Sequence, residues 1–368
     1  MQNVKTDLPF IKEVMENGGD DLKKCFQCAT CTSVCALSVG DNPFPRKQMA
    51  NIQWGLKNQV VTDKNLWMCH QCGDCTTYCP RGAKPANVLA SARRSSVLHY
   101  AAPIQLAKFF GDKKYFPVLL IAPAIIIGIF LAMIGHLNIP DGDVHYAEFF
   151  PHLWLNIFFT ALFVGAIFFM AKGAFSFWKD MDSSNSNQKT KSNYVQAGIE
   201  TVKEVFTHVK FKKCEANQER YLGHLGIFWG FAILLVVTAI AVLLVFLERY
   251  PLGFFHPVKI LGNVGAAALL WGCWVVYKKR KESNEDDLKS TYFDWYFFGI
   301  LASVGVTGVL TELLRFMNIA IFAYPVYFIH LVLVFNLLIF LPFSKFAHVV
   351  YRSLAIYYDK LTNPKAAV

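Results

Sequence analysis

Residues 225–247 read LGIFWGFAILLVVTAIAVLLVFL, a run without a charged side chain. Such a run can cross a bilayer as one helix, which takes ~20 apolar residues. Five further runs, nearly free of charge, lie at residues 116–135, 153–177, 257–277, 293–314 and 322–343. The sequence therefore predicts an all-α protein whose larger part is a bundle of six transmembrane helices. Buried helices of a large soluble protein are the alternative, but too few residues remain to cover them.

The composition and the placement of charge agree with a membrane protein. Hydrophobic residues make up 54% of the chain and charged residues 17%, whereas soluble domains average ~25% charged. Seventeen Lys and Arg residues lie in the segments 178–220, 278–291 and from 344 onward, against only Arg249 and Arg315 on the opposite side. Because positive loops stay cytoplasmic, both termini are predicted to be cytoplasmic in a multi-pass inner-membrane protein. Topology thus accounts for the formal charge of +10, and no nucleic-acid partner is expected.

Eight of the ten cysteines form two copies of one motif. Residues 25–35 read CFQCATCTSVC, and residues 69–80 read CHQCGDCTTYCP. This spacing is that of bacterial ferredoxins, in which the fourth Cys of each run binds the other [4Fe-4S] cluster. One cluster is expected on Cys25, Cys28, Cys31 and Cys79, and the second on Cys69, Cys72, Cys75 and Cys35. A zinc ribbon is the alternative, although it would need only two pairs of ligands.

Histidines in apolar segments are costly and tend to be functional. His330 and His348 lie 18 residues apart, which on one continuous helix is five turns, a shared face and roughly 27 Å. This spacing predicts two haem b ligands, one near each side of the membrane. By depth, His224 is expected to pair with His348 on an inner haem. For an outer haem, His256 is expected to pair with His330, with His152 as its rival; interfacial histidines without a metal are the alternative.

Glu312 and Arg315 end the fifth apolar run on the side expected for His330. Quinol oxidation releases protons, and a carboxylate at a helix end supplies a proton acceptor beside water. Residues three apart face one way on a helix. The sequence therefore predicts a quinone site near the outer face with Glu312 and Arg315 as polar contacts. An interfacial ion pair that only marks the end of the span is the alternative.

These features divide the chain into regions. Residues 1–110 are expected to form an α-helical, ferredoxin-like cytoplasmic domain with two [4Fe-4S] clusters, and residues 111–350 a six-helix transmembrane haem b domain. Residues 178–220 are expected to form a cytoplasmic loop with an amphipathic helix, and residues 351–368 a cytoplasmic tail. No G-x-G-x-x-G nucleotide fingerprint follows a strand. The chain is therefore expected to be a subunit that depends on soluble partners.

The order of the two modules, with RYLGHLGIFWG at residues 220–230, resembles the C subunits of the quinone-interacting membrane-bound oxidoreductases of sulfate-reducing prokaryotes. Those subunits resemble a fusion of the iron–sulfur and cytochrome b subunits of heterodisulfide reductase, and their membrane part is similar to the gamma subunit of respiratory nitrate reductase. The resemblance implies haem b, menaquinone, soluble flavin-containing and iron–sulfur partner subunits, and adenylylsulfate reductase as the downstream acceptor. The nitrate reductase gamma subunit has a second histidine where this sequence has Leu234, so the outer haem needs another partner or is absent.

Three functions remain open at this point. The first is a relay in which menaquinol is oxidised and electrons pass through haem b and the two clusters to soluble partners, as in sulfate respiration. The second runs the same components in reverse, as a quinone reductase or in electron transfer of the heterodisulfide reductase type. The third is a haem-free membrane anchor for a ferredoxin module, or a transporter with an appended cluster sensor.

Overall fold

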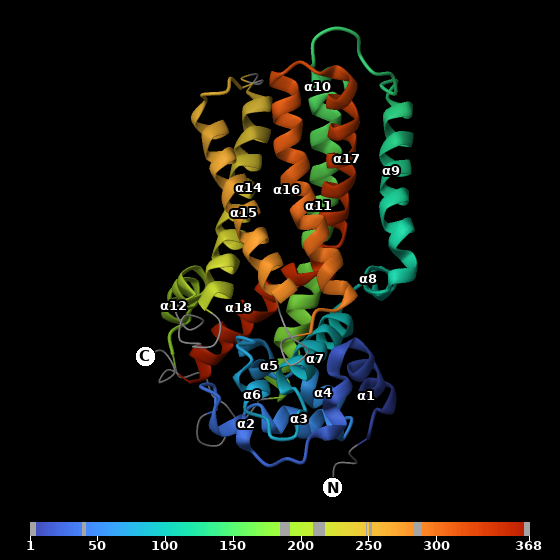
Figure 1. The fold of residues 1–368 in the computed structure, drawn as a ribbon. Coiled ribbons are helices and arrows are strands. Elements are labelled where there is room, and N and C mark those ends of the chain that lie inside the picture. Colours follow the sequence, from blue (N-terminus) through green and yellow to red (C-terminus); the bar gives the residue numbers. More distant parts are fainter. Residues whose placement is uncertain are drawn as a thin grey trace.

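The computed structural model describes residues 5–38, 42–184, 192–208, 218–247, 249, 252–282 and 289–363. These residues form helices and no strand, so the prediction of an all-α fold is confirmed. A bundle of long helices stands on a compact domain of short ones (Figure 1). The end of the bundle that meets this cysteine-containing domain is called the proximal end here, and the opposite end the distal end.

The cysteine-containing domain has its own apolar core. Phe10, Met49, Leu66 and Leu89 come from separate helices and are each at most 1% exposed, which ties the short helices together. The longest of the helices begins at Pro85, where a proline costs no hydrogen bond. The helices of this part are α1 (Leu8–Val14), α2 (Thr30–Ser33), α3 (Arg46–Gln53), α4 (Lys57–Val61), α5 (Lys64–Met68), α6 (Asp74–Thr77), α7 (Pro85–Tyr100) and α8 (Ile104–Gly111).

Among the described residues, six helices are long and apolar enough to cross a membrane. Successive membrane helices run in opposite directions (Figure 1). Five of them gather in one bundle, and the first stands at its edge and packs against the last (Figure 1). They are α9 (Phe116–Met133), α11 (His152–Ser184), α14 (Gln218–Phe246), α15 (Pro257–Glu282), α16 (Tyr292–Phe316) and α17 (Ala320–Ile339).

Helices α14 and α15 approach each other closely because glycines line their contact. A Cβ atom added at Gly226 would lie 3.0 Å from the carbonyl oxygen of Ala268, and one added at Gly272 would lie 2.6 Å from the carbonyl oxygen of Gly223. Small residues at such spacing let two helix backbones meet inside a membrane. The glycines on either side of His224 therefore have a packing role of their own.

Helix α17 ends before the chain reaches His348. The prediction that His330 and His348 share one continuous helix is therefore wrong. Helix α17 ends at Ile339, a single 3-10 turn spans Leu341–Phe343, and α18 (Lys345–Thr362) follows. Pro342 has no N–H with which to continue the helix. The Ser344 side chain then accepts a hydrogen bond from the Phe346 N–H at 3.2 Å and caps the new helix.

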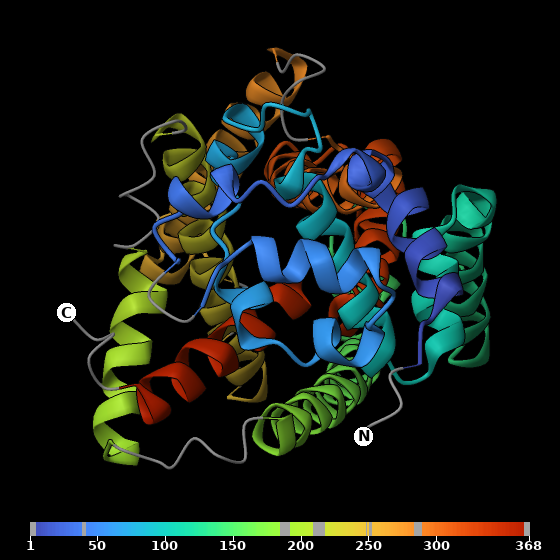
Figure 2. The ribbon, with the colours of Figure 1, turned by 90° about the horizontal axis from the view of Figure 1, so that it is seen from below.

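Helix α18 runs obliquely beneath the bundle toward α12 (Tyr194–Thr207), as Figures 1 and 2 show. It packs against α5, α11 and α12, so it joins the cysteine-containing domain to the membrane helices. It begins before the predicted start of the tail at residue 351. Helix α12 lies within the predicted loop 178–220, while residues 185–191, 209–217 and 364–368 fall outside the described part of the chain.

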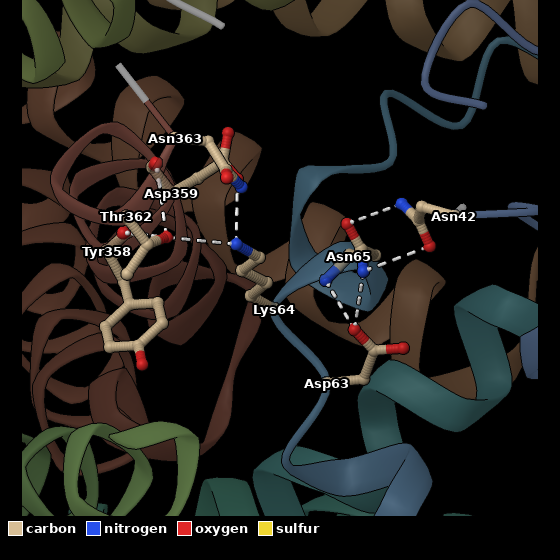
Figure 3. A network of polar contacts seen from close by, with 8 residues as sticks. All are labelled: Asn42, Asp63, Lys64, Asn65, Tyr358, Asp359, Thr362 and Asn363. Carbon is tan, nitrogen blue, oxygen red and sulfur yellow. Dashed lines mark hydrogen bonds and ion pairs between the residues drawn. The ribbon is translucent and has the colours of Figure 1, made fainter. Parts of the chain in front are cut away.

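An ion pair with little exposure joins the domain to α18 (Figure 3). The Lys64 Nζ lies 2.9 Å from Asp359 Oδ1, and the two side chains are 8% and 10% exposed. The same ammonium group donates to Thr362 Oγ1 at 3.3 Å. Lys360, the next residue of α18, lies 3.1 Å from Glu204 of α12. Helix α18 is therefore held from two sides by partly dehydrated charges.

Candidate electron-transfer site

The first group of thiols surrounds one cavity. Cys25, Cys28, Cys31 and Cys79 line it, and the fourth of these comes from the second motif. Burial raises the pKa of Cys31, and the neighbouring thiols of Cys25, Cys28 and Cys79 act in the same direction. Thiols held in this state release their protons when a metal binds. The structure thus brings together the four residues that the sequence assigned to the first cluster.

The second group is built in the same way. Burial raises the pKa of Cys35 to about 11, and the thiols of Cys69 and Cys72 contribute. The pKa of Cys75 is raised further, first by burial and then by Cys69, Cys72 and Cys35. Three thiols again come from one motif and the fourth from the other. This exchange of the fourth ligand is the arrangement of two-cluster ferredoxins, and it supports the proposed ligand sets.

The two motifs share one backbone shape. Gln27 and Gln71 have φ values of 58° and 54°, and Ala29 and Gly73 have 72° and 100°. A left-handed conformation costs a residue with a Cβ roughly 1–2 kcal/mol, so Ala29 bears strain that Gly73 avoids. Strained loops of this kind concentrate at functional sites. In the second motif, the Gln71 N–H donates to Cys69 Sγ at 3.4 Å, a contact of the type that tunes cluster potentials.

The arrangement of these thiols differs from that of a zinc site. A structural zinc ion needs four ligands that converge on one point at about 2.3 Å for sulfur. Within the described ranges, no three His, Cys, Asp or Glu side chains are placed to hold a single metal ion. Thiols that surround a cavity without converging suit a larger inorganic cluster. The cavity among Cys25, Cys28, Cys31 and Cys79 therefore suits an iron–sulfur cluster.

Three histidines gather at the proximal end of the bundle. His224 comes from α14, His348 from α18, and His208 follows the last residue of α12. The rings of His208 and His224 are 5.1 Å apart, and His224 and His348 are close enough to interact electrostatically. The Nδ1 atom of His208 is buried and has no hydrogen-bond partner. The neighbouring imidazoles of His224 and His348 are the kind of nitrogen ligands that a haem b takes, and His208 lies beside them.

The protonation state of His348 suits such a role. Burial lowers its pKa well below the usual value, and the positive charge of Arg352 acts in the same direction. The neutral imidazole is the form that binds iron. His208 was not among the histidines singled out from the sequence, although its place at the end of an amphipathic helix, near the start of the apolar run with His224, was a usable signal.

The proposed outer pair is not brought together. His330 is the eleventh residue of α17, about 15 Å below its distal end, and its Nδ1 lies 2.9 Å from Thr307 Oγ1 on α16. His256 precedes the first residue of α15, and His152 begins α11, both at the distal end. Two axial ligands must lie on opposite faces of one iron. These histidines therefore do not fit an outer haem with His330.

Glu312 and Arg315 contact different neighbours. The Glu312 Oε1 lies 3.4 Å from Lys259 Nζ of α15, with both side chains less than 20% exposed. Arg315 instead acts electrostatically on Tyr146, whose pKa burial raises to about 12. The Tyr146 hydroxyl donates to the carbonyl oxygen of Thr311 at 2.7 Å. The two predicted quinone contacts thus lie at the distal end but do not pair with each other.

Comparisons with known proteins agree with this two-part architecture. Residues 117–367, more than half of the chain, match the model of the family described as Citrate utilization protein B. The chain belongs to the citrate utilization protein B family. Residues 21–83 of this family member match a 4Fe-4S dicluster domain, which confirms the prediction of an iron–sulfur domain joined to a membrane part.

Citrate utilization protein B of Escherichia coli is 25% identical over 361 residues, 90% of this chain and 88% of that protein. The C subunit of the H(2):CoB-CoM heterodisulfide,ferredoxin reductase of Methanothermobacter marburgensis is 39% identical over 93 residues, 24% of this chain and 49% of that protein. A protein of Archaeoglobus profundus that is like the C subunit of heterodisulfide reductase is 34% identical over 89 residues, with 24% and 47% covered. The chain spans about half the length of these two archaeal relatives. No solved structure matches.

The family, the dicluster domain and the six apolar helices together make this chain an iron–sulfur electron-transfer protein with a membrane part. The two kinds of relative cover different stretches. The likeness to heterodisulfide reductase subunits covers about a quarter of the chain, and the dicluster match places it in the cysteine-containing domain. The likeness to citrate utilization protein B runs through both parts.

Proposed function

We propose that this CitB family member is the membrane subunit of a quinone oxidoreductase complex, in which electrons move between membrane quinone and soluble partner subunits. The observation that carries the proposal is the position of the proximal histidines beside the second cysteine group. The His348 ring lies 6.1 Å from the ring of Trp67, and Trp67 stands two residues before Cys69. The proposed haem site and the proposed site of the second cluster would thus lie on the two sides of one packed boundary.

His224 and His348 would hold the proposed haem b, which would supply one-electron transfer at the proximal end. Trp67 is 1% exposed and stacks on Tyr351 with ring centroids 5.0 Å apart. Its buried indole therefore leaves little room for water where α5 meets α18. An apolar, dry connection favours electron transfer over side reactions with solvent. No step is assigned to an outer haem, because His256 and His152 do not fit it.

The narrower proposal follows the sequence resemblance. Menaquinol gives up its electrons in the membrane part, the two clusters carry them, and soluble flavin-containing and iron–sulfur subunits take them up, with adenylylsulfate reductase as the acceptor in sulfate respiration. The distal end around Glu312 and Arg315 is the proposed quinone site. The excess of Lys and Arg in the proximal connections supports a cytoplasmic location for the clusters and both termini in the inner membrane.

Reverse flow, from soluble subunits to quinone, is the second candidate. The observation that favours it is the likeness to citrate utilization protein B of Escherichia coli over 90% of this chain. Use of an organic acid as a fuel releases electrons, and a membrane subunit with the same two parts would deliver them to quinone. The haem, the clusters and the quinone are the same in both directions, so one preparation tests both.

The test begins with the purified protein in detergent. A reduced-minus-oxidised absorption spectrum with a b-type α-band supports the relay, and its absence supports a haem-free anchor. A menaquinol analogue is then added to the oxidised protein, and the clusters are followed by electron paramagnetic resonance. Reduction of the clusters by the quinol supports the first direction. Oxidation of dithionite-reduced clusters by the quinone, without the converse, supports the second.

A further inference from the structure

Arg352 connects the helix of His348 to the loop of the second cysteine motif. It follows His348 by one turn of α18 and therefore lies on the same face of that helix. Its guanidinium donates to the carbonyl oxygen of Cys69 at 3.0 Å and to that of Trp67 at 3.3 Å. A third contact, at 2.8 Å, joins it to Nδ1 of His70. One side chain thus holds three parts of the loop that carries the second group.

A second arginine approaches the same cysteine from another helix. Arg93 of α7 is 8% exposed and donates to the carbonyl oxygen of Cys69 at 3.5 Å. Asp359, a carboxylate further along α18, forms an ion pair with Lys64, with Nζ and Oδ1 2.9 Å apart. Two guanidinium groups therefore converge on the backbone of one proposed cluster ligand. Positive charge in a place with little water acts strongly, because the screening is weak.

The first cysteine group has a different environment. Cys28 is exposed, and the arginines that line its cavity, Arg46 and Arg81, are exposed as well. Arg81 lies 4.1 Å from the ring of Phe26, which is 67% exposed. Charges in this position are screened by water and salt. The first group therefore faces the solvent, whereas the second faces α18 and the histidines.

We infer that the cluster of Cys35, Cys69, Cys72 and Cys75 is the membrane-proximal one, and that Arg352 is a positioning residue that fixes its loop against the His348 helix and raises its reduction potential. The inference rests on the proposed function and adds the order of the two clusters. One electron passes at a time between the histidine site and this cluster, and no bond or proton has to move. A reduced cluster carries one more negative charge, which the arginines stabilise.

The experiment compares Arg352→Gln with the wild type as full-length, cluster-loaded protein in detergent. Dithionite is the reductant in a redox titration followed by electron paramagnetic resonance, and Cys72→Ser identifies the signal of the second cluster. The expected result is a lower midpoint potential for the second cluster alone. Electron transfer between haem and clusters, measured by rapid mixing, is expected to slow at least about tenfold, with unchanged haem content. Unchanged potentials and rate, or a shift confined to the first cluster, would overturn the inference.

Arg94→Gln is the matched control. Arg94 lies on α7 and, like Arg352, joins the cysteine-containing domain to the membrane part, because its guanidinium lies 4.9 Å from the ring of Phe293 on α16. It also donates to the carbonyl oxygen of Gly111 at 2.9 Å. These contacts involve neither cysteine group, so both cluster potentials are expected to stay unchanged. If Arg352→Gln loses a cluster, the same potentials and transfer rate are measured in Arg352→Lys instead. Lysine keeps the charge but not the forked donors, so the potential is expected to be largely kept and the transfer to remain slow.

The result is separable from that of the proposed function. The potentials are read from the clusters alone and need neither quinone nor haem. A wild-type protein without a b-type band would refute the relay, while a potential shift in Arg352→Gln would still place the second cluster beside α18. In the converse outcome, the protein contains haem and reacts with quinone, while Arg352→Gln leaves the potential of the second cluster unchanged. That result would support the proposed function and refute this inference.

Discussion

The imidazole of His348 lies 6.1 Å from the indole of Trp67, ring centre to ring centre. The first residue belongs to α18, beneath the membrane helices, and the second to α5, two residues before Cys69. Their contact places a proposed haem ligand against a side chain that stands two residues before a proposed cluster ligand. The boundary between the two parts of the chain is therefore also the expected route of the electrons.

The exchange of fourth ligands is tested with Cys79→Ser. Cys79 stands in the second motif but lines the cavity of Cys25, Cys28 and Cys31. The substitution is therefore expected to damage the first cluster and to leave the second intact. The measurement is iron and acid-labile sulfide per chain, with electron paramagnetic resonance to identify the remaining cluster. A wild-type content near one cluster, bound zinc, or loss of the second cluster in the variant would contradict the assignment.

Cys35→Ser is the matched partner of that variant. Cys35 ends the first motif, yet the thiols of Cys69 and Cys72 act on it. We expect this variant to lose the second cluster and keep the first, which is the mirror image of Cys79→Ser. If each variant instead damaged the cluster of its own motif, the ligand sets would have to be redrawn without exchange.

The inner haem is tested with His348→Ala. The substitution removes one of the two proposed axial ligands, so the variant is expected to lose its b-type absorption band and to uncouple quinol oxidation from cluster reduction. His256→Ala is the control, since His256 lies at the distal end and its replacement is expected to leave the band unchanged. Full haem content in His348→Ala would refute the pairing with His224.

His208 needs a variant of its own because its ring lies 5.1 Å from that of His224. If His224 and His348 are the two ligands, His208→Ala is expected to keep the haem and to shift the absorption band or its potential slightly. Loss of the haem in His208→Ala, with its retention in His348→Ala, would make His208 the ligand instead.

The ion pair of Lys64 and Asp359 is expected to hold the domain to α18. Removing one partner leaves an uncompensated charge with little exposure, which costs about 3 kcal/mol or more. Lys64→Met and Asp359→Leu are therefore each expected to lower the temperature at which the cluster absorbance is lost. The double variant is expected to recover most of the loss, because an apolar pair replaces the charges. Single variants that melt like the wild type would show that the pair contributes little.

The predictable parts of this fold were those that depend on local sequence. Apolar runs of sufficient length gave six membrane helices, and the doubled cysteine spacing gave the two thiol groups, including the exchanged Cys35 and Cys79. Both patterns follow from distances along the chain, which the sequence contains. The end of helix α17 at Ile339 also has a local cause, in Pro342 and in the capping residue Ser344. It was missed because the apolar run continues to Phe343 and hides the change of helix.

The contacts between distant segments were not predictable in this way. Lys259 pairs with Glu312 across 53 positions of the chain, and Arg352 reaches Cys69 across 283. Depth counted along a helix also misplaced His330, because that estimate assumed that its helix continues to His348. The relative positions of His256 and His330 depend on where each helix begins, which a single apolar profile does not fix to within one turn.

The distal end is tested with Glu312→Gln. If this carboxylate accepts a proton from the quinol, its loss is expected to slow menaquinol-analogue oxidation by ~100-fold, in the range of general-base catalysis, while the haem and the clusters remain. The structure also supplies the alternative, because Lys259 lies 3.4 Å from the same carboxylate. An ion pair with only a structural role predicts that Lys259→Met and Glu312→Gln lower stability alike and leave turnover per haem unchanged. A proton acceptor predicts instead that turnover falls in Glu312→Gln and stays measurable in Lys259→Met, where the carboxylate is still present. Normal turnover in Glu312→Gln would make Glu312 a boundary residue, and the quinone would then have to be sought at the proximal end.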